Sequence, residues 1–523
     1  MTILHGILQA IVKIGIRVLR TFSPSVDSLL KRLEETPGIP VSNPSISYWQ
    51  IPPSSISDYG SEASVRLPER ADIVILGSGI TGTAFARTIL KEKNRGQALK
   101  VIMLEARGAC SGATGRNGGH IAPVSYSDYG ELKGEHGIEV AKEIIRFRLA
   151  HLPEILKVAA EDNLIDESQC REVEVFDVYC DAGLYGQAKT MLSGYQEDMP
   201  SEGSSFRIHE GTETIKRLSL QLDEKVVGCL STRGGALHPY RFVTGILRRL
   251  LEAHPEEFSL FTHTPCTAIK TSTGGGYRVM THKGIIETGH VVHATNAWAS
   301  HLLPGMRGRI LPLRGVMSAQ IPRAGPGKRS WNSSRSFTFY PAKSMLELDY
   351  LTQQLADLEG DGALMVGGGI VRTKGWINEL GNVDDSGWNP EMARYLGGVL
   401  EGYFEGSEAE RETTAWGGLI GMSTDGQPWV GRVPEFVSGR ASGAGAGGVG
   451  GLAAPGEWVA AGYSGEGMVH GWLSGCGVAR QVSGGAGMEG QMYKVGRERW
   501  AGAGVAEAAV RVYGARVRKT ENK

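Results

Sequence analysis

The sequence feature that most constrains the fold is DIVILGSGITG, residues 72–82, in which an apolar run leads into a GxGxxG spacing. The run predicts a buried strand, and the residues after it predict a helix over about 80–93. Gly77 permits a tight turn out of the strand, Gly79 lets the backbone approach a diphosphate, and Gly82 lets the helix pack closely on the sheet. A second apolar run, KVIML, follows, so the segment predicts a strand-helix-strand unit in a parallel sheet.

Glu105 ends the second strand, at the place where dinucleotide-binding folds carry an acidic residue. A carboxylate there accepts hydrogen bonds from both hydroxyls of an adenosine ribose, which favours a free 2′-hydroxyl over NADP. A solvated acid at a strand end is the alternative interpretation. The fingerprint does not separate NAD from FAD. The next stretch, ARGACSGATGRNGGHIAP, is small and glycine-rich, so its backbone could follow a diphosphate and pass beneath a flat ring, which favours a flavin.

The segment LEARGACSGATGRNGGHIAP also resembles flavoproteins of the D-amino-acid oxidase, glycine oxidase and sarcosine oxidase superfamily. It is especially similar to fungal FAD-dependent oxidoreductases and bacterial gamma-glutamylputrescine oxidases. Further matches follow in chain order, over about residues 70–480: GGALHPYRFVTGILRRL, VVHATNAWASHLLP, ILPLRGVMSAQ, DYLTQQ, LMVGGGIVR, WGGLIGMSTDGQPWVGRVP and WVAAGYSGEGMVHGW. The resemblance implies FAD as the cofactor. It also implies oxidation of an amine or amino acid by hydride transfer to flavin N5, with reoxidation by O₂ or another electron acceptor.

The expected fold class is α/β, with a Rossmann-like FAD-binding domain interleaved with an antiparallel-sheet α+β substrate domain. A helix is expected over about 137–160, with a kink at Pro153. The expected segments are 1–36, an amphipathic N-terminal segment; 37–70, a Pro-rich lead-in; 71–175, 226–310 and 413–480, the FAD-binding domain, with a Gly-rich insertion at 436–456; 176–225 and 311–412, the substrate domain; and 481–523, a C-terminal tail.

The expected FAD-binding residues come from the glycine turn, the strand-end acid, the segment after it, and two later segments that the resemblance adds. They are Gly77, Ser78, Gly79, Ile80, Thr81, Gly82, Glu105, Ala106, Ser111, Gly112, Ala113, Thr114, Arg116, Asn117, Gly118, Gly119, Thr295, Asn296, Ala297, Gly465, Glu466, Gly467 and Met468. The helix after the last turn would face N1 and O2 of the flavin and stabilise negative charge there. An ordinary strand-to-helix connection is the alternative for that turn.

Three residues are candidates for contact with the reacting groups. His120 follows GRNGG, where the resemblance brings the chain near the flavin ring; it either polarises flavin or substrate or fills space with a satisfied hydrogen bond. Tyr350 lies in a stretch that resembles the strand lining the substrate side, where a phenol could bind a substrate carboxylate; a core tyrosine is the alternative. Arg314 could pair with a carboxylate, and a structural role is slightly favoured.

Two departures from the superfamily pattern bear on the reaction. LMVGGGIVRTKG has glycines where some sarcosine-oxidase-like members place an oxygen-activating lysine, so a dehydrogenase with another acceptor stays open. The six cysteines match no covalent flavin attachment point and no zinc spacing, so noncovalent FAD and no metal are expected.

Composition excludes one class of partner and leaves the compartment open. The formal net charge of −1 gives no broad cationic field for nucleic acid. The start of the chain, MTILHGILQAIVKIGIRVLRTF, is apolar and basic without an acidic residue. Such a start is typical of a mitochondrial presequence, of an anchor in the membrane interface, or of a helix packed on the body. A cytoplasmic or mitochondrial location is therefore expected.

Three functions remain in competition at this point. The first is a flavin-dependent amine or amino-acid oxidoreductase. The second is a tailoring oxidase or dehydrogenase acting on a larger amine-bearing metabolite. The third is a flavin-fold protein that binds FAD as a structural ligand and acts by interaction, because sites on one fold are widely reused.

Overall fold

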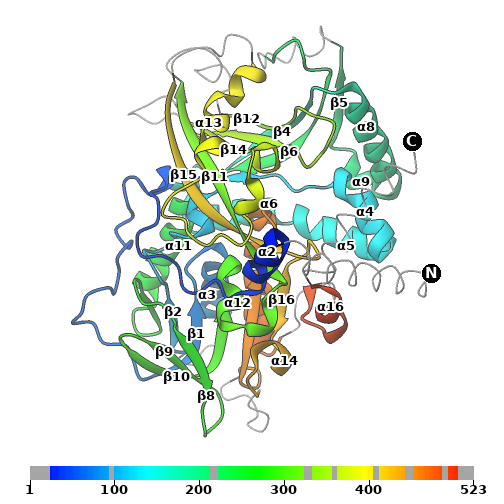
Figure 1. Ribbon diagram of the computed structural model, residues 1–523. Helices are drawn as coiled ribbons and strands as arrows, with labels where there is room; N and C mark the ends of the chain where they lie inside the picture. Colours follow the sequence, from blue (N-terminus) through cyan, green and yellow to red (C-terminus); the bar gives the residue numbers. More distant parts are fainter. Residues whose placement is uncertain are drawn as a thin grey trace.

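Two β-sheets organise the chain, one in each half of the molecule as Figure 1 draws it. The computed structural model describes residues 24–92, 99–211, 222–322, 333–355, 362–404, 411–441, 451–485 and 493–504.

The first sheet is built around the strand that the sequence predicts. Five of its strands are parallel neighbours: β17 (Gly456–Ala461), β10 (Gly284–His293), β1 (Arg70–Leu76), β2 (Val101–Leu104) and β7 (Phe258–Phe261). β16 (Trp429–Arg432) extends this sheet antiparallel to β17, and a meander of β8 (Ala268–Thr271) and β9 (Tyr277–Thr281) joins it through β10. Parallel strands are covered on both faces, which explains the unbroken apolar run of β1.

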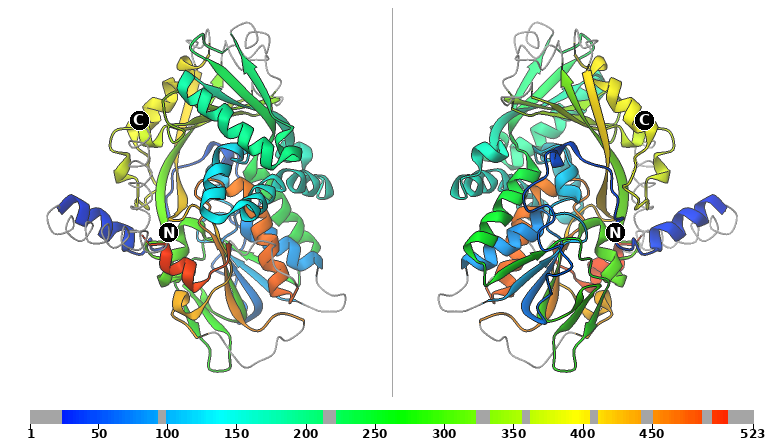
Figure 2. Two further views of the ribbon diagram at one scale, coloured as in Figure 1. Left: turned by 90° about the vertical axis from the view of Figure 1, so that its right-hand side faces the viewer. Right: turned by 90° about the vertical axis from the view of Figure 1, so that its left-hand side faces the viewer.

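One face of the first sheet is covered by three helices, which Figure 2 shows close together in the lower half: α3 (Ile80–Glu92), α11 (Pro239–Ala253) and α15 (Gly471–Val482). α3 and α15 can approach closely because Gly475 has no side chain. A Cβ at this position would lie 2.3 Å from the carbonyl oxygen of Thr81. The other face packs on the β8–β9 meander, with Val74 and Ile102 against Ile269 and Val279.

The second sheet is mostly antiparallel. Its strands follow the order β15 (Arg411–Ser423), β11 (Ile310–Pro322), β14 (Leu364–Gly368), β13 (Asp349–Gln353), β12 (Arg335–Tyr340), β4 (Arg171–Tyr179), β6 (Gly228–Ala236) and β3 (His120–Ile121), with β5 (Arg207–Glu210) beside β6. β12 and β4 form its parallel pair. α13 (Pro390–Gly398) covers one face, where Phe176 and Phe337 pack with Met392 and Leu396. The opposite face looks toward the first sheet.

The predicted helix over 137–160 is two helices, α5 (Ile138–Leu149) and α6 (His151–Glu161). The break lies at Ala150, three residues before Pro153, as expected near a residue that cannot donate a backbone hydrogen bond. The other helices in the described part of the chain are α2 (Pro24–Glu34), α4 (Tyr126–His136), α7 (Ile165–Ser168), α8 (Ala182–Asp198), α9 (Pro200–Gly203), α12 (Ala299–Leu302), α14 (Glu435–Ser438), α16 (Arg497–Gly502) and short 3-10 turns, among them η1 (Tyr48–Gln50) and η8 (Gly467–Val469).

The structure moves three of the expected domain boundaries. β4 and β6 both belong to the second sheet, so the portion expected over 176–225 spans 171–236, and β3 adds residues 120–121 to the same sheet. β15 also belongs to it, so the last portion of the FAD-binding domain begins after 423, and not at 413. The error has a physical cause: short strands with similar alternation give no signal of the sheet in which they pair.

The Pro-rich lead-in is packed more closely than an extended segment would be. Ser47 and Gln50 form a capping box around η1, and the Trp49 side chain is buried and donates from Nε1 to the Asn117 carbonyl oxygen at 2.5 Å. The C-terminal segment is likewise attached in part, because Arg499 on α16 pairs with Asp425.

Residues 1–23 of the expected amphipathic segment and 442–450 of the Gly-rich insertion lie outside the described residues. None of the described helices has the length and apolarity that a membrane span needs.

Candidate functional site

A cavity of about 910 Å³ lies between the two sheets. Nearly all the residues expected to bind a cofactor line it, together with His120, Tyr350 and residues of β4, β11 and β12. Four expected residues do not line it: Ser78, Gly82, Ser111 and Gly119. Ser78 and Gly82 instead support the turn beneath the cavity.

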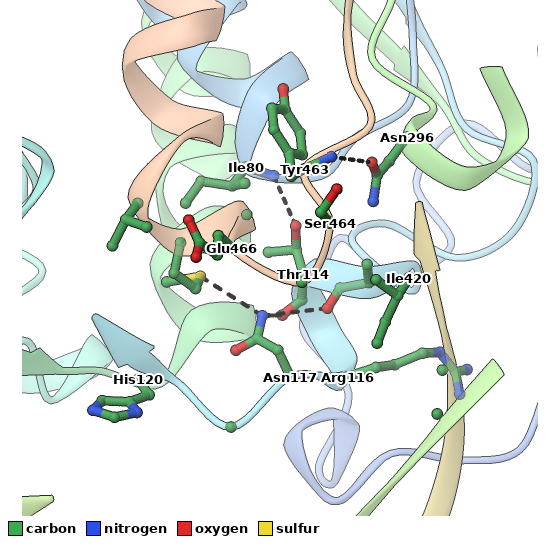
Figure 3. Close-up of a pocket in the computed structure, with 18 of the residues that line it drawn as sticks. Ile80, Thr114, Arg116, Asn117, His120, Asn296, Ile420, Tyr463, Ser464 and Glu466 are labelled. Carbon is green, nitrogen blue, oxygen red and sulfur yellow. Dashed lines mark hydrogen bonds between the residues drawn. The ribbon is translucent and has the colours of Figure 1, made fainter. Parts of the chain in front are cut away.

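The β1–α3 turn fits the role predicted for its glycines. Gly77 has a φ of +102°, and a Cβ there would lie 2.7 Å from the Ala294 carbonyl oxygen. A Cβ at Gly82 would lie 2.1 Å from the Gly77 carbonyl oxygen, so the helix can start here only without a side chain. The Ile80 amide donates to Thr114 Oγ1 at 3.0 Å, which ties the helix start to the segment after Glu105 (Figure 3).

Glu105 stands at the end of β2 and lines the cavity. Its Oε2 accepts hydrogen bonds from the Ser78 amide at 3.1 Å and from Ser78 Oγ at 2.7 Å, and its Oε1 accepts from the Arg107 amide at 3.1 Å. An ionised carboxylate has about four acceptor positions, so capacity remains for a ribose hydroxyl.

Unpartnered polar atoms around the cavity suit a polar ligand. Thr295 Oγ1 and His120 Nε2 are buried without a hydrogen-bond partner, and both residues line the cavity. Buried polar atoms normally have partners. Together with the glycine turn and the cavity's extent along both sheets, they suit a dinucleotide that carries a flat ring.

The turn after β17 closes the cavity from the other side. Asn296 Oδ1 accepts from the Gly462 amide at 3.0 Å and from the Tyr463 amide at 3.4 Å. The second of these bonds, drawn in Figure 3, shows how this turn is joined to the end of β10. Gly465, Glu466 and Met468 line the cavity, as the resemblance implies.

Glu466 belongs to a charged network around the buried Arg148 that the sequence did not predict. Its Oε2 lies 3.4 Å from Arg148 Nε, and Arg148 Nη1 contacts Asp128 Oδ2 at 2.9 Å. Burial raises the pKa of Glu466 to about 7, Arg148 opposes this shift, and Asp128 adds to it. Burial and Arg148 hold the pKa of His470 well below its usual value. Arg148 and Glu466 are far apart in the chain, so no local motif links them.

His120 and Tyr350 both line the cavity and lie near each other. Figure 3 shows where His120 lies. Their ring centroids are 6.2 Å apart with planes inclined by 28°. Burial lowers the pKa of His120 to about 4 and raises that of Tyr350, so both side chains are neutral near pH 7. A Cβ at Gly118 would lie 2.5 Å from the Tyr350 ring, and one at Gly367 would lie 2.5 Å from both Tyr350 Cζ and Met317 Sδ, so these two glycines make room for the phenol.

Arg314 is separated from this pair. Its Nε donates to Glu379 Oε2 at 2.7 Å and its Nη1 to the Asp384 carbonyl oxygen at 2.7 Å. It is absent from the described lining of the cavity, so its geometry fits the structural alternative.

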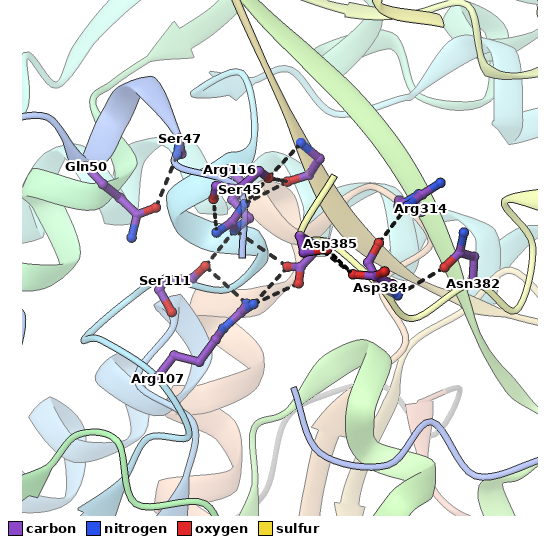
Figure 4. A network of polar contacts seen from close by, with 12 residues as sticks. Ser45, Ser47, Gln50, Arg107, Ser111, Arg116, Arg314, Asn382, Asp384 and Asp385 are labelled. Carbon is purple, nitrogen blue, oxygen red and sulfur yellow. Dashed lines mark hydrogen bonds and ion pairs between the residues drawn. The ribbon is translucent and has the colours of Figure 1, made fainter. Parts of the chain in front are cut away.

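A second buried network braces the lead-in and the second sheet against the segment after Glu105 (Figure 4). Arg107 Nη1 contacts Asp385 Oδ1 at 2.9 Å and Oδ2 at 3.0 Å. Arg116 Nε donates to the Ser111 carbonyl oxygen at 2.7 Å, and its Nη2 donates to the Ser45 carbonyl oxygen at 2.7 Å. Both arginines line the cavity, but their guanidinium donors are largely engaged by protein acceptors.

Asp177 is the cavity residue that the sequence reasoning missed most clearly. It is on β4, where Val173, Val175, Asp177 and Tyr179 alternate on one face of REVEVFDVY, and both Val175 and Asp177 line the cavity. The sequence could have indicated this residue, because a carboxylate that alternates with apolar residues on one strand face points inward, where acidic side chains are rare.

Comparisons with known proteins agree with this site. The model of the family described as FAD dependent oxidoreductase matches residues 72–481. No curated protein matches the sequence.

Solved structures share the fold at low sequence identity. Glycine oxidase from Bacillus cereus is similar with a TM-score of 0.60 and 14% identity, over 81% of this chain and 97% of that one. L-proline dehydrogenase from P. horikoshii has a TM-score of 0.58 and 21% identity, over 82% of this chain and 97% of that one. Iminodiacetate oxidase from Chelativorans sp. has a TM-score of 0.58 and 17% identity, over 81% and 98%. The expected fold class is confirmed.

Proposed function

Since the chain belongs to the family of FAD-dependent oxidoreductases, with FAD as the cofactor, we propose that it oxidises a carbon–nitrogen bond of an amine or amino acid. The substrate loses a hydride from the carbon and a proton from the nitrogen, and water hydrolyses the resulting imine to a carbonyl compound. FAD supplies the acceptor for the hydride, and its electrons then pass to O₂ or to another acceptor.

One observation carries this proposal. The glycine turn, Glu105 and the Gly465–Met468 turn, which fit FAD, line the same cavity as His120 and Tyr350. A ligand held by the first sheet therefore shares an enclosed space with a substrate held by the second. In support, the neighbours named as glycine oxidase, L-proline dehydrogenase and iminodiacetate oxidase act, by their names, on amines or amino acids.

The roles of His120 and Tyr350 in this proposal are to orient the substrate. Both are half-buried and neutral near pH 7, so neither carries a charge that the reaction must neutralise. His120 Nε2 has no partner among the described residues and can hydrogen-bond an amine nitrogen. Such positioning is what the protein contributes when a cofactor performs the redox step.

Within the family, we propose a position near the gamma-glutamylputrescine oxidases, on the strength of the shared GRNGG segment before His120. Among the described residues that line the cavity there is no lysine, which supports an acceptor other than O₂ as the second candidate.

The test is to purify the protein, record its visible spectrum before and after denaturation, and add amines and amino acids without oxygen. Release of free FAD and bleaching by one amine class would support the proposal. Retained flavin that no amine or amino acid bleaches would favour the non-catalytic alternative, and bleaching by larger amine-bearing metabolites alone would favour a tailoring enzyme. Readmitting O₂ and assaying hydrogen peroxide separates an oxidase from a dehydrogenase.

A further inference from the structure

The charges that line the cavity are unevenly compensated. Five carboxylates line it among the described residues: Glu105, Asp177, Glu202, Asp385 and Glu466. Three of these are ion-paired, Asp385 with Arg107, Glu466 with Arg148, and Glu202 with Arg146. Glu105 lies at the end that fits a ribose. Asp177 remains, and no described cation forms an ion pair with it.

The cations of the cavity leave little for a substrate carboxylate. Arg107 and Arg116 are held by Asp385 and by backbone carbonyl oxygens, as described above. Arg233 stands at the rim in an ion pair with Glu172. His120 and His301 have lowered pKa values because of burial, so they are neutral near pH 7. The described lining therefore has one unpaired anion beyond the ribose end and no unpaired guanidinium or ammonium.

Asp177 is placed in register with Tyr350. Across the sheet, Asp177 on β4 pairs with Thr338 on β12, and Thr338 pairs with Tyr350 on β13. Directly paired residues point to the same face, and here all three line the cavity. Two strand spacings separate the Cα atoms of Asp177 and Tyr350 by about 10 Å.

The surroundings of Asp177 hold its carboxylate without neutralising it. Tyr126 Oη donates to Asp177 Oδ2 at 2.7 Å, and Thr338 supplies a further hydrogen bond. The nearby phenols of Tyr126, Tyr179 and Tyr340 have raised pKa values because of burial and the charge of Asp177, so they are neutral. A carboxylate so placed in an enclosed cavity favours a cationic ligand group.

We propose that the substrate is a linear amine with a second, distal ammonium group, and that Asp177 binds this distal cation while the nitrogen to be oxidised lies near His120 and Tyr350. The inference rests on the proposed function and narrows its substrate class from amines and amino acids to diamines and related polyamines. The separation of the two sites suits about four to six methylene groups between the nitrogens. An α-amino acid is disfavoured because its carboxylate would find no unpaired cation in the described lining.

The experiment uses the FAD-loaded full chain and two kinds of probe. The first is a pair of equal length, pentamethylenediamine and n-pentylamine, used to reduce the flavin without oxygen. The second is a non-oxidisable diamine whose carbons next to nitrogen carry methyl groups in place of hydrogen, used in calorimetric binding. The variants are Asp177→Asn and, as a matched control, Asp349→Asn. Asp349 is also a buried carboxyl held by two phenols, those of Tyr395 and Tyr403, but it is on the opposite face of the sheet from Tyr350.

The expected result is selective. Asp177→Asn should weaken binding of both diamines by about tenfold or more, since a hydrogen bond to a charged group is lost, and should change n-pentylamine by less than about twofold. Asp349→Asn should bind both probes as the wild type does. Asp177→Glu keeps the charge and reaches further, so it should retain diamine binding and shift the preference to a shorter chain.

Two results would overturn the inference: equal binding of the diamine and the monoamine by the wild type, or equal losses for both probes in Asp177→Asn. The proposed function fails separately, if the non-oxidisable diamine binds in an Asp177-dependent manner but no amine bleaches the flavin. Preferential bleaching by amino acids would preserve the proposed function and remove the diamine assignment.

Discussion

The buried pair between Arg107 and Asp385 offers the sharpest test of how the two halves of the site are joined. Asp385→Asn replaces a carboxylate that accepts from Arg107 at 2.9 and 3.0 Å and lies 3.8 Å from Arg116 Nε. The three side chains are 1–5% exposed, so water cannot compensate for the lost charge.

The magnitude follows from this burial. Removing one partner of a buried ion pair costs about 3–5 kcal/mol, because the other charge is left without compensation. The entropy of unfolding is about 2.1 cal/mol/K per residue, or about 1.1 kcal/mol/K for a chain of 523 residues that unfolds cooperatively. The midpoint Tm of Asp385→Asn should therefore fall by about 3–5 °C.

The assay is thermal unfolding of the FAD-loaded protein, with Asp384→Asn as the matched control. The carboxylate of Asp384 is exposed and accepts from Ser386, so its replacement should move Tm by less than about 1 °C. The double replacement Arg107→Met with Asp385→Leu removes both charges and should be more stable than Asp385→Asn alone. The reasoning is refuted if Asp385→Asn behaves like Asp384→Asn, or if the double variant is the less stable one.

Three further predictions address the cofactor, the charge and the reacting end of the cavity. Gly82→Ala should weaken FAD retention by more than about tenfold, because its Cβ would lie 2.1 Å from the Gly77 carbonyl oxygen. Gly130→Ala, at an exposed position of α4 outside the cavity lining and with no atom within 4 Å of the added Cβ, should retain FAD in the same dialysis assay. Diamine binding should decline as pH falls below about 6, because burial raises the pKa of Asp177 to about 6 and its protonated form carries no charge. The affinity of Asp177→Asn should not change over this pH range. An affinity of the wild type that is independent of pH would contradict the prediction. His120→Ala should slow anaerobic flavin reduction, and the pH profiles of this rate for wild type and variant should have the same shape between pH 6 and 8, since burial lowers the pKa of His120 to about 4. A wild-type transition near pH 6.5 that disappears in the variant would show that His120 titrates there and would contradict the prediction.

The parts of the site that could be predicted from the sequence are those whose physical requirement is local. Gly77, Gly79 and Gly82 meet constraints of turn and close approach within a few residues, and Glu105 is fixed by the length of one helix and one strand. These positions line or support the cavity as expected.

The parts that could not be predicted depend on pairing across the sheets. Arg107 and Asp385 are 278 positions apart, and Arg148 meets Glu466 through helices and turns that share no motif. The register that places Asp177 and Tyr350 on one face, two strands apart, is set by β12, which pairs with both strands. Periodicity shows which face a residue occupies and does not show which strand lies next to it.

The division of labour between the sheets explains why cofactor and substrate differ in how well the sequence predicts them. The proposed FAD site uses mainly backbone at strand ends, and the sequence shows the glycines that such a site needs. In the proposed function the substrate meets side chains from the middle of β4, β12 and β13, which line the cavity and whose identities can change without altering the fold. The ion pairs of Asp385 and Glu466 neutralise two of the cavity's acids, so the field that a substrate meets at the second sheet is dominated by Asp177. A single substitution there should therefore change which amines bind while leaving FAD in place.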